Sequence, residues 1–116
     1  ADFTLLKTAY DVAEEKHFSV KVGNVLASDV FYNDDTTVND RWKKMGVLAV
    51  DMESAALYMT AARCRKHALT ILTISDHLYR GEKLSAQERQ TGFTNMMEIA
   101  LETAVRLQNN RQMEDL

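Results

Sequence analysis

The sequence predicts an α/β fold in which helices flank a mostly parallel or mixed sheet. Two short apolar runs, Val47–Val50 and Ala68–Ile74, are typical of buried strands. Segments with apolar residues at helical spacing lie before and after each run. Strands that alternate with helices along a chain favour a parallel sheet, because each helix returns the chain to the start of the next strand.

Composition narrows the class of protein. The chain has 116 residues, of which 46% are hydrophobic and 27% charged, as in one ordinary globular domain. A net charge of −3 offers no basic surface to nucleic acid, and no apolar run is long enough to span a membrane. Residues Ala1–Thr4 do not resemble a signal peptide, and the single Cys64 suits a reducing compartment. We therefore expect a cytoplasmic protein without a nucleic-acid or membrane partner.

The first part of the chain predicts a helix followed by a strand. Apolar residues recur at helical spacing over Thr4–Lys16, and Asp2 or Thr4 is a suitable N-cap. Phe18–Val22 alternates apolar and polar residues, as a strand does, and ends at Gly23. Residues 24–32 could continue this strand after a break.

A loop over Asn33–Thr37 leads to a short helix over Val38–Met45. Asn, Asp and Thr dominate the loop, and their side chains bond readily to nearby backbone. Trp42 and Met45 are the apolar residues expected to anchor the helix. Gly46 is a suitable residue to end it.

Two carboxylates, Asp51 and Glu53, lie where the strand Val47–Val50 passes into the next helix. A carboxylate is costly to bury without a donor, and ligands of open α/β sheets usually bind at the carboxyl ends of strands. A ligand site at this junction is one interpretation, and a simple helix cap formed by Asp51 or Glu53 is the other. The apolar face expected for the helix comprises Met52, Ala55, Ala56, Met59 and Ala62.

The strand Ala68–Ile74 is expected to be covered on both faces. A loop over Leu78–Leu84 that could close over a ligand follows, and Ser85 and Glu88 then have the spacing of a capping box. Residues 108–116 lose the helical period and are expected to fray. The stripe by which the last helix is expected to pack on the sheet comprises Phe93, Met96, Met97, Ala100, Leu101, Ala104 and Leu107.

Polar or aromatic residues follow three of the predicted strands. Because parallel strands end at one edge of a sheet, these clusters together predict a pocket there. His67 and His77 lack metal-ligand spacing with any Cys or His, so we expect no metal site. The three clusters are Ser28-Asp29 with Phe31-Tyr32, Asp51-Met52-Glu53, and Ser75-Asp76-His77.

Asp76 is the candidate general acid. A carboxyl group at the end of an apolar strand is desolvated, which favours its protonated form and lets it donate a proton. The alternative is that Asp76 caps a turn through Ser75 or His77. Arg89 lies in the first turn of the last helix, where a cation opposes the helix dipole. It therefore suits a specific partner such as Asp76, and a solvated surface arginine is the alternative.

Four segments together resemble the bacterial hexameric (trimer-of-dimers) purine nucleoside phosphorylases. They are Val22–Tyr32, Val50–Ala56, Thr73–His77 and Glu88–Phe93. Their order and spacing also match, and the likeness runs from about Ala1 to Leu107. The resemblance implies a transferase, specifically a pentosyltransferase of purine salvage. It would catalyse reversible phosphorolysis of purine (deoxy)ribonucleosides to free base and (deoxy)ribose 1-phosphate, with phosphate as co-substrate and no cofactor.

The resemblance also implies roles for individual residues. Asp76 would protonate N7 of the purine, with Arg89 bonded to it, and Ser75 would help to place the base. The base pocket would be lined by Phe31, Tyr32, Ser28 and Val50, while Met52 and Glu53 would contact the sugar. Asp51 departs from the family, which usually has Glu at this position.

Members of this family are about twice as long as this chain. Residues 1–107 are therefore expected to be the carboxyl-terminal half of a single phosphorylase domain, with the phosphate-binding residues in a missing amino-terminal segment. That segment and further copies of the chain, six in the family, are the expected protein partners. Activity of the chain alone is expected to be low. The alternatives are a nucleosidase of the same superfamily and a non-catalytic α/β assembly module.

Overall fold

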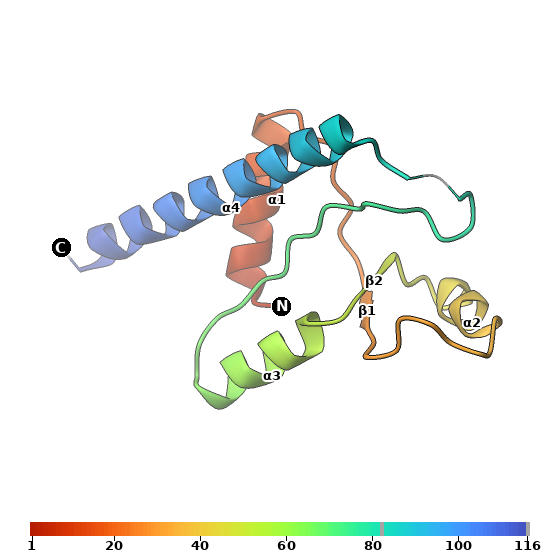
Figure 1. The fold of residues 1–116 in the computed structure, drawn as a ribbon. Coiled ribbons are helices and arrows are strands. Elements are labelled where there is room, and N and C mark those ends of the chain that lie inside the picture. The colour runs from red at the N-terminus through yellow and green to blue at the C-terminus, as the bar shows by residue number, and fades with distance from the viewer. Residues whose placement is uncertain (82, 116) are drawn as a thin grey trace. The chain divides into compact units, whose positions relative to one another are not determined.

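The computed structural model describes residues 1–81 and 83–115 and contains helices and one small parallel sheet (Figure 1). No helix within the described residues is both long enough and apolar enough to cross a membrane. The chain divides into two compact units, residues 1–20 with 69–116, and residues 21–68. The elements are α1 (Phe3–Glu15), β1 (Val25–Ala27), α2 (Val38–Lys44), β2 (Ala49–Asp51), α3 (Ser54–Arg63) and α4 (Ala86–Glu114).

The unit of residues 1–20 and 69–116 is built on the packing of α1 against α4 (Figure 1). Of the two N-cap candidates, Asp2 caps α1, since its side chain accepts a hydrogen bond of 2.9 Å from the backbone N–H of Leu5. The predicted capping box of Ser85 and Glu88 begins α4. The buried core comprises Ala9, Val12, Ala13 and Ile99, with Phe18, Leu69 and Ile71 packed partly buried against it.

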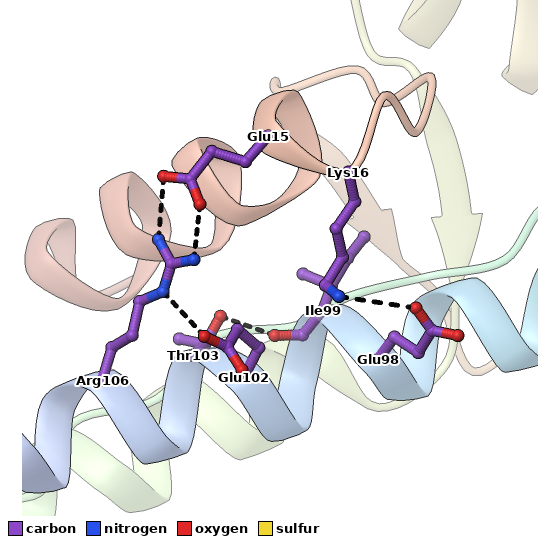
Figure 2. A network of polar contacts seen from close by, with 7 residues as sticks. All are labelled: Glu15, Lys16, Glu98, Ile99, Glu102, Thr103 and Arg106. Carbon is purple, nitrogen blue, oxygen red and sulfur yellow. Dashed lines mark hydrogen bonds and ion pairs between the residues drawn. The ribbon is translucent and has the colours of Figure 1, made fainter.

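Ion pairs flank this core where α1 crosses α4 (Figure 2). Arg106 donates two hydrogen bonds to the Glu15 carboxylate, at 3.0 and 2.5 Å, and a third to Glu102 at 3.0 Å. Lys16 lies 3.7 Å from the Glu98 carboxylate. The bonds from Arg106 lower the pKa of Glu15, because they favour its charged form. This cluster of charges therefore links the carboxyl-terminal end of α1 to α4.

The unit of residues 21–68 contains the sheet. Strands β1 and β2 pair in parallel, with Val25 opposite Ala49 and Ala27 opposite Asp51. Gly23 lies close to Leu48, so that an added Cβ would come within 2.6 Å of its Cδ1 and the Leu48 side chain would have to shift. The helix α2 ends as predicted, with Gly46 in the left-handed conformation (φ +79°).

Two predicted strands are absent from the described residues. Residues 18–22 do not form the predicted strand. The strand β1 forms instead within residues 24–32, the segment considered as its continuation. Residues 68–74 do not form a strand either, since the described part of the unit that holds residues 69–74 offers no neighbouring strand with which to form a ladder. Cover on both faces is also wrong, because Leu72 and Ile74 are exposed while Ile71 packs on the core.

Several apolar faces predicted to be packed are exposed. Trp42 and Met45 do not anchor α2, which has no buried residue. On α3 only Ser54 is buried, so the predicted apolar face is open. On α4 the buried residues are Ile99 and Thr103 rather than the predicted stripe, because α1 covers a different face of the helix. Three exposed residues of the predicted stripe and the adjacent Val105 recur every fourth residue along α4. They are Phe93, Met97, Leu101 and Val105.

The end of α4 also differs from the prediction. The helix continues beyond Leu107 to Glu114 instead of fraying. Loss of an apolar period removes a reason to pack, but it does not stop a helix whose residues have good intrinsic propensity, such as Gln, Arg, Met and Glu. The apolar period and the helix therefore end at different residues.

Candidate functional site

The carboxyl ends of β1 and β2 lie side by side, as the sequence predicted. The backbone N–H of Ser28, just after β1, donates a 2.9 Å hydrogen bond to the carbonyl of Asp51, the last residue of β2. The Ser28 hydroxyl also accepts a 3.2 Å bond from the N–H of Val30, which closes a turn after the strand. Two of the three predicted clusters therefore share one edge of a parallel sheet.

Asp51 is the most enclosed carboxylate at this edge. One of its oxygens accepts a 2.8 Å hydrogen bond from the hydroxyl of Ser54, which is buried. The other oxygen, Oδ2, is buried and has no hydrogen-bond partner among the residues that the structure describes. An unpaired buried acceptor is costly, so this carboxylate is incompletely satisfied by the described residues. Ser54 was not predicted as a site residue.

The capping alternative for this junction is not supported. Glu53 is the residue that precedes the first turn of α3, but its side chain makes no capping bond to the helix. It accepts a 3.2 Å bond from the N–H of Met52, outside the helix. Asp51 bonds to a side chain and not to a helix N–H. Val50, Met52 and Glu53 are all exposed at this edge.

Phe31 and Tyr32 form an exposed aromatic pair after β1. Their ring centroids are 4.9 Å apart and the ring planes lie at 76°, an edge-to-face arrangement. The two residues are 76% and 89% exposed, so neither ring is part of a core. Flat apolar surfaces of this kind are available to stack on an aromatic ligand.

The third cluster lies in the other unit. The Ser75 hydroxyl donates a 2.7 Å hydrogen bond to the Asp76 carboxylate, and the Ser75 carbonyl accepts a 3.0 Å bond from the N–H of Leu84. The turn that follows is capped by His77, whose Nδ1 accepts from the backbone N–H groups of Tyr79 and Arg80. Asp76 is therefore oriented by Ser75 while His77 stabilises the turn.

Two expectations for the acid differ from the structure. Asp76 is exposed, so the desolvation expected at the end of a buried strand is absent, because residues 68–74 are not covered on both faces. Within the described residues, no hydrogen bond or ion pair joins the side chains of Asp76 and Arg89. Arg89 does lie in the first turn of α4, as predicted, with its backbone N–H bonded to Ser85.

The predicted site residues thus fall into two groups, each placed within its own unit. Convergence of the two groups on one ligand stays a prediction. Within the described residues, no three His, Cys, Asp or Glu side chains form a group that could hold a metal ion. One group carries Ser28, Phe31, Tyr32, Val50, Asp51, Met52 and Glu53, and the other carries Ser75, Asp76 and Arg89.

Comparison with known proteins places the chain in a family. A model of the phosphorylase superfamily matches residues 1–107. A protein of Clostridium beijerinckii named "Purine nucleoside phosphorylase DeoD-type" is 54% identical over 109 residues, which cover 94% of this chain and 46% of that protein. Proteins with the same name from Clostridium perfringens (strain SM101) and Geobacillus sp. (strain WCH70) are 56% and 54% identical over 92% of the chain. The chain spans about half the length of these relatives. The chain belongs to the phosphorylase superfamily.

Proposed function

We propose that residues 1–107 form the carboxyl-terminal half of a purine nucleoside phosphorylase domain. The complete enzyme transfers the (deoxy)ribosyl group of a purine nucleoside to phosphate, reversibly, and releases the free base. The observation that carries this proposal is the 54% identity, over 94% of the chain, to a protein named purine nucleoside phosphorylase. The parallel strand edge with its carboxylates supports it, because such edges bind ligands in α/β folds.

Asp76 is the general acid of the proposed reaction. As the glycosidic bond breaks, the base leaves with the bonding electrons, and a proton delivered to N7 makes it a neutral leaving group. A positioned acid contributes about two to four powers of ten in rate. The bond from Ser75 orients the Asp76 carboxylate, and Arg89 joins it when substrate binds, since catalytic hydrogen bonds often tighten only in the substrate complex.

The strand edge in the other unit binds the nucleoside. Phe31 and Tyr32 offer exposed rings for the purine. Ser28, after β1, and Val50, in β2, contribute to the walls of the same pocket. Glu53 accepts hydrogen bonds from the sugar hydroxyls and Met52 packs against the sugar. The unpaired Oδ2 of Asp51 accepts a further bond at this edge.

The amino-terminal half of the domain, which lies outside this chain on this proposal, supplies the phosphate site. On this proposal the amino-terminal half completes the fold, covers apolar faces such as the exposed side of α4, and binds phosphate as co-substrate. The enzyme acts in the cytoplasm in purine salvage, as a homohexamer, without a metal or another cofactor. Its ligands are purine nucleosides and phosphate, and it has neither a nucleic-acid nor a membrane partner.

The test is phosphorolysis by a reconstituted enzyme, defined here as the chain co-purified with the segment of the Clostridium beijerinckii relative that lies outside the matched region. We expect release of base from inosine or adenosine that requires phosphate, and little release by the chain alone. Base release without phosphate would instead indicate a nucleosidase. If calorimetry with adenine and hypoxanthine shows no binding to the reconstituted enzyme, the chain is a non-catalytic assembly module.

A further inference from the structure

The segment that carries Asp76 contacts the helix that carries Arg89 at Thr73 and Gly92. The hydroxyl of Thr73 donates a 3.2 Å hydrogen bond to the carbonyl of Gly92, and it lies 3.6 Å from the sulfur of Met96. A Cβ added at Gly92 would come within 2.7 Å of the Thr73 methyl group, closer than real Cβ atoms approach. Gly92 is therefore the residue that allows this segment to contact the helix.

Two further contacts join the same parts of the chain. The N–H of Leu84 bonds to the carbonyl of Ser75, and Asp76 pairs with Lys83 as an antiparallel bridge. The capping box of Ser85 and Glu88 then fixes the start of α4 directly after Leu84. The backbones at Asp76 and Arg89 are thus held by contacts on both sides of the intervening loop.

The Thr73–Gly92 contact lies close in sequence to both Asp76 and Arg89. Thr73 lies three residues before Asp76, and Gly92 lies three residues after Arg89, within one helical turn. A shift at this contact therefore moves the acid and the arginine relative to each other. Misplacement of catalytic groups by about 1 Å can lower a rate a hundred-fold.

We propose that Thr73 and Gly92 are positioning residues that set the geometry between Asp76 and Arg89. This inference rests on the proposed function, and it assigns no contact with substrate to either residue. The Thr73 hydroxyl fixes the distance between the segment and α4, and the missing side chain of Gly92 makes that short distance possible.

Substitutions at these two positions distinguish the effect of the Thr73 hydroxyl from that of its methyl group. Thr73→Val removes the donor and keeps the volume, whereas Thr73→Ser keeps the donor and removes the methyl. In the reconstituted enzyme we expect Thr73→Val and Gly92→Ala to lower kcat on inosine about ten- to a hundred-fold, with a KM changed less than three-fold. Thr73→Ser alone should stay within about three-fold of wild type.

The double variant Thr73→Ser with Gly92→Ala provides the rescue. Without the Thr73 methyl, the nearest atoms to the new Cβ are the Thr73 oxygen at 3.9 Å and Cβ at 4.0 Å, an ordinary contact. We therefore expect the double variant to recover most of the kcat that Gly92→Ala loses. A loss in the double variant equal to that of Gly92→Ala alone would overturn the proposal.

A substrate that needs no acid distinguishes positioning from general stability. A purine nucleoside methylated at N7 already carries the positive charge that protonation creates, so its base leaves without a proton from Asp76. Thr73→Val should therefore lower turnover of inosine at least ten-fold more than turnover of 7-methylinosine. Equal losses on the two substrates would show a merely structural role.

Amide hydrogen exchange of the 116-residue chain tests the contacts between the Asp76 segment and α4 without an activity assay. The N–H of Leu84 and that of Arg89 should exchange faster in Thr73→Val and Gly92→Ala than in wild type, and recover in the double variant. Unchanged exchange would overturn the inference even if the reconstituted enzyme proved inactive. Inactivity of the wild-type reconstituted enzyme, in contrast, would count against the proposed function alone.

Discussion

The two units of the chain differ in what stabilises them. Residues 1–20 and 69–116 contain every buried apolar side chain among the described residues, and ion pairs join their two helices. In residues 21–68 the only buried side chain is that of Ser54, and the structure depends on a short parallel ladder and local hydrogen bonds. Yet this second unit carries most of the predicted nucleoside-binding residues. The predicted binding residues thus lie in the unit with fewer buried side chains, where local opening is expected to cost less.

Removing the acid should have the largest effect. We expect Asp76→Asn to lower kcat of the reconstituted enzyme on inosine by two to four powers of ten, because the amide cannot deliver a proton to N7. Turnover of 7-methylinosine should fall far less. Asp34→Asn, in the exposed loop before α2, is the matched control and should change neither rate. A small effect of Asp76→Asn on inosine would remove the acid from its proposed place.

The same substitution in the two units tests the contrast in packing. Val12 is fully buried in the core, whereas Val50 is 42% exposed at the end of β2. Val12→Ala should lower the free energy of unfolding by about 1–3 kcal/mol, since it removes buried methyl groups and leaves a cavity. Val50→Ala should change it by less than about 0.5 kcal/mol. Thermal unfolding of the 116-residue chain followed by circular dichroism measures both, and equal effects would contradict the contrast.

The ion pair of Glu15 and Arg106 predicts a smaller, pH-dependent effect. Hydrogen bonds from Arg106 lower the pKa of Glu15 from its ordinary value of 4.5. A carboxyl with a lowered pKa in the folded state adds stability above its ordinary pKa, and this is lost as the pH falls through the lowered value. Glu15→Gln should therefore lower the Tm at pH 7 and converge with wild type as the pH falls below 4.5. The neighbouring Glu14→Gln is the control, and a difference that persists unchanged in acid would exclude the ion pair as its cause.

Local signals predicted the helices and the sheet edge well. Asp2, Ser85 and Glu88 specify helix starts through bonds made within a few residues, and each of these bonds is present. The junction of β2 and α3 was also predicted, because an apolar run followed by a helical period needs no distant partner to be recognised.

Predictions that depended on distant partners were less successful. Ala68–Ile74 has the composition of a central strand, but a strand forms only beside another strand, and the described residues of the unit that holds residues 69–74 include none. The stripe on α4 is apolar in sequence, yet it packs only if a sheet covers it. Sequence pattern thus reports which surface is suited to burial, and the rest of the fold decides whether that surface is buried. The contact of Thr73 with Gly92 was missed because it joins residues 19 apart through a backbone carbonyl.

A crystal structure of the reconstituted enzyme with a bound purine nucleoside tests the central claim most directly. We predict that the Asp76 carboxyl lies within hydrogen-bond reach of N7, about 2.6–3.2 Å. In the same complex, Glu53 should bond to the sugar hydroxyls and the rings of Phe31 and Tyr32 should line the base. A nucleoside bound elsewhere, or Asp76 and Glu53 on opposite faces of the enzyme, would contradict the account.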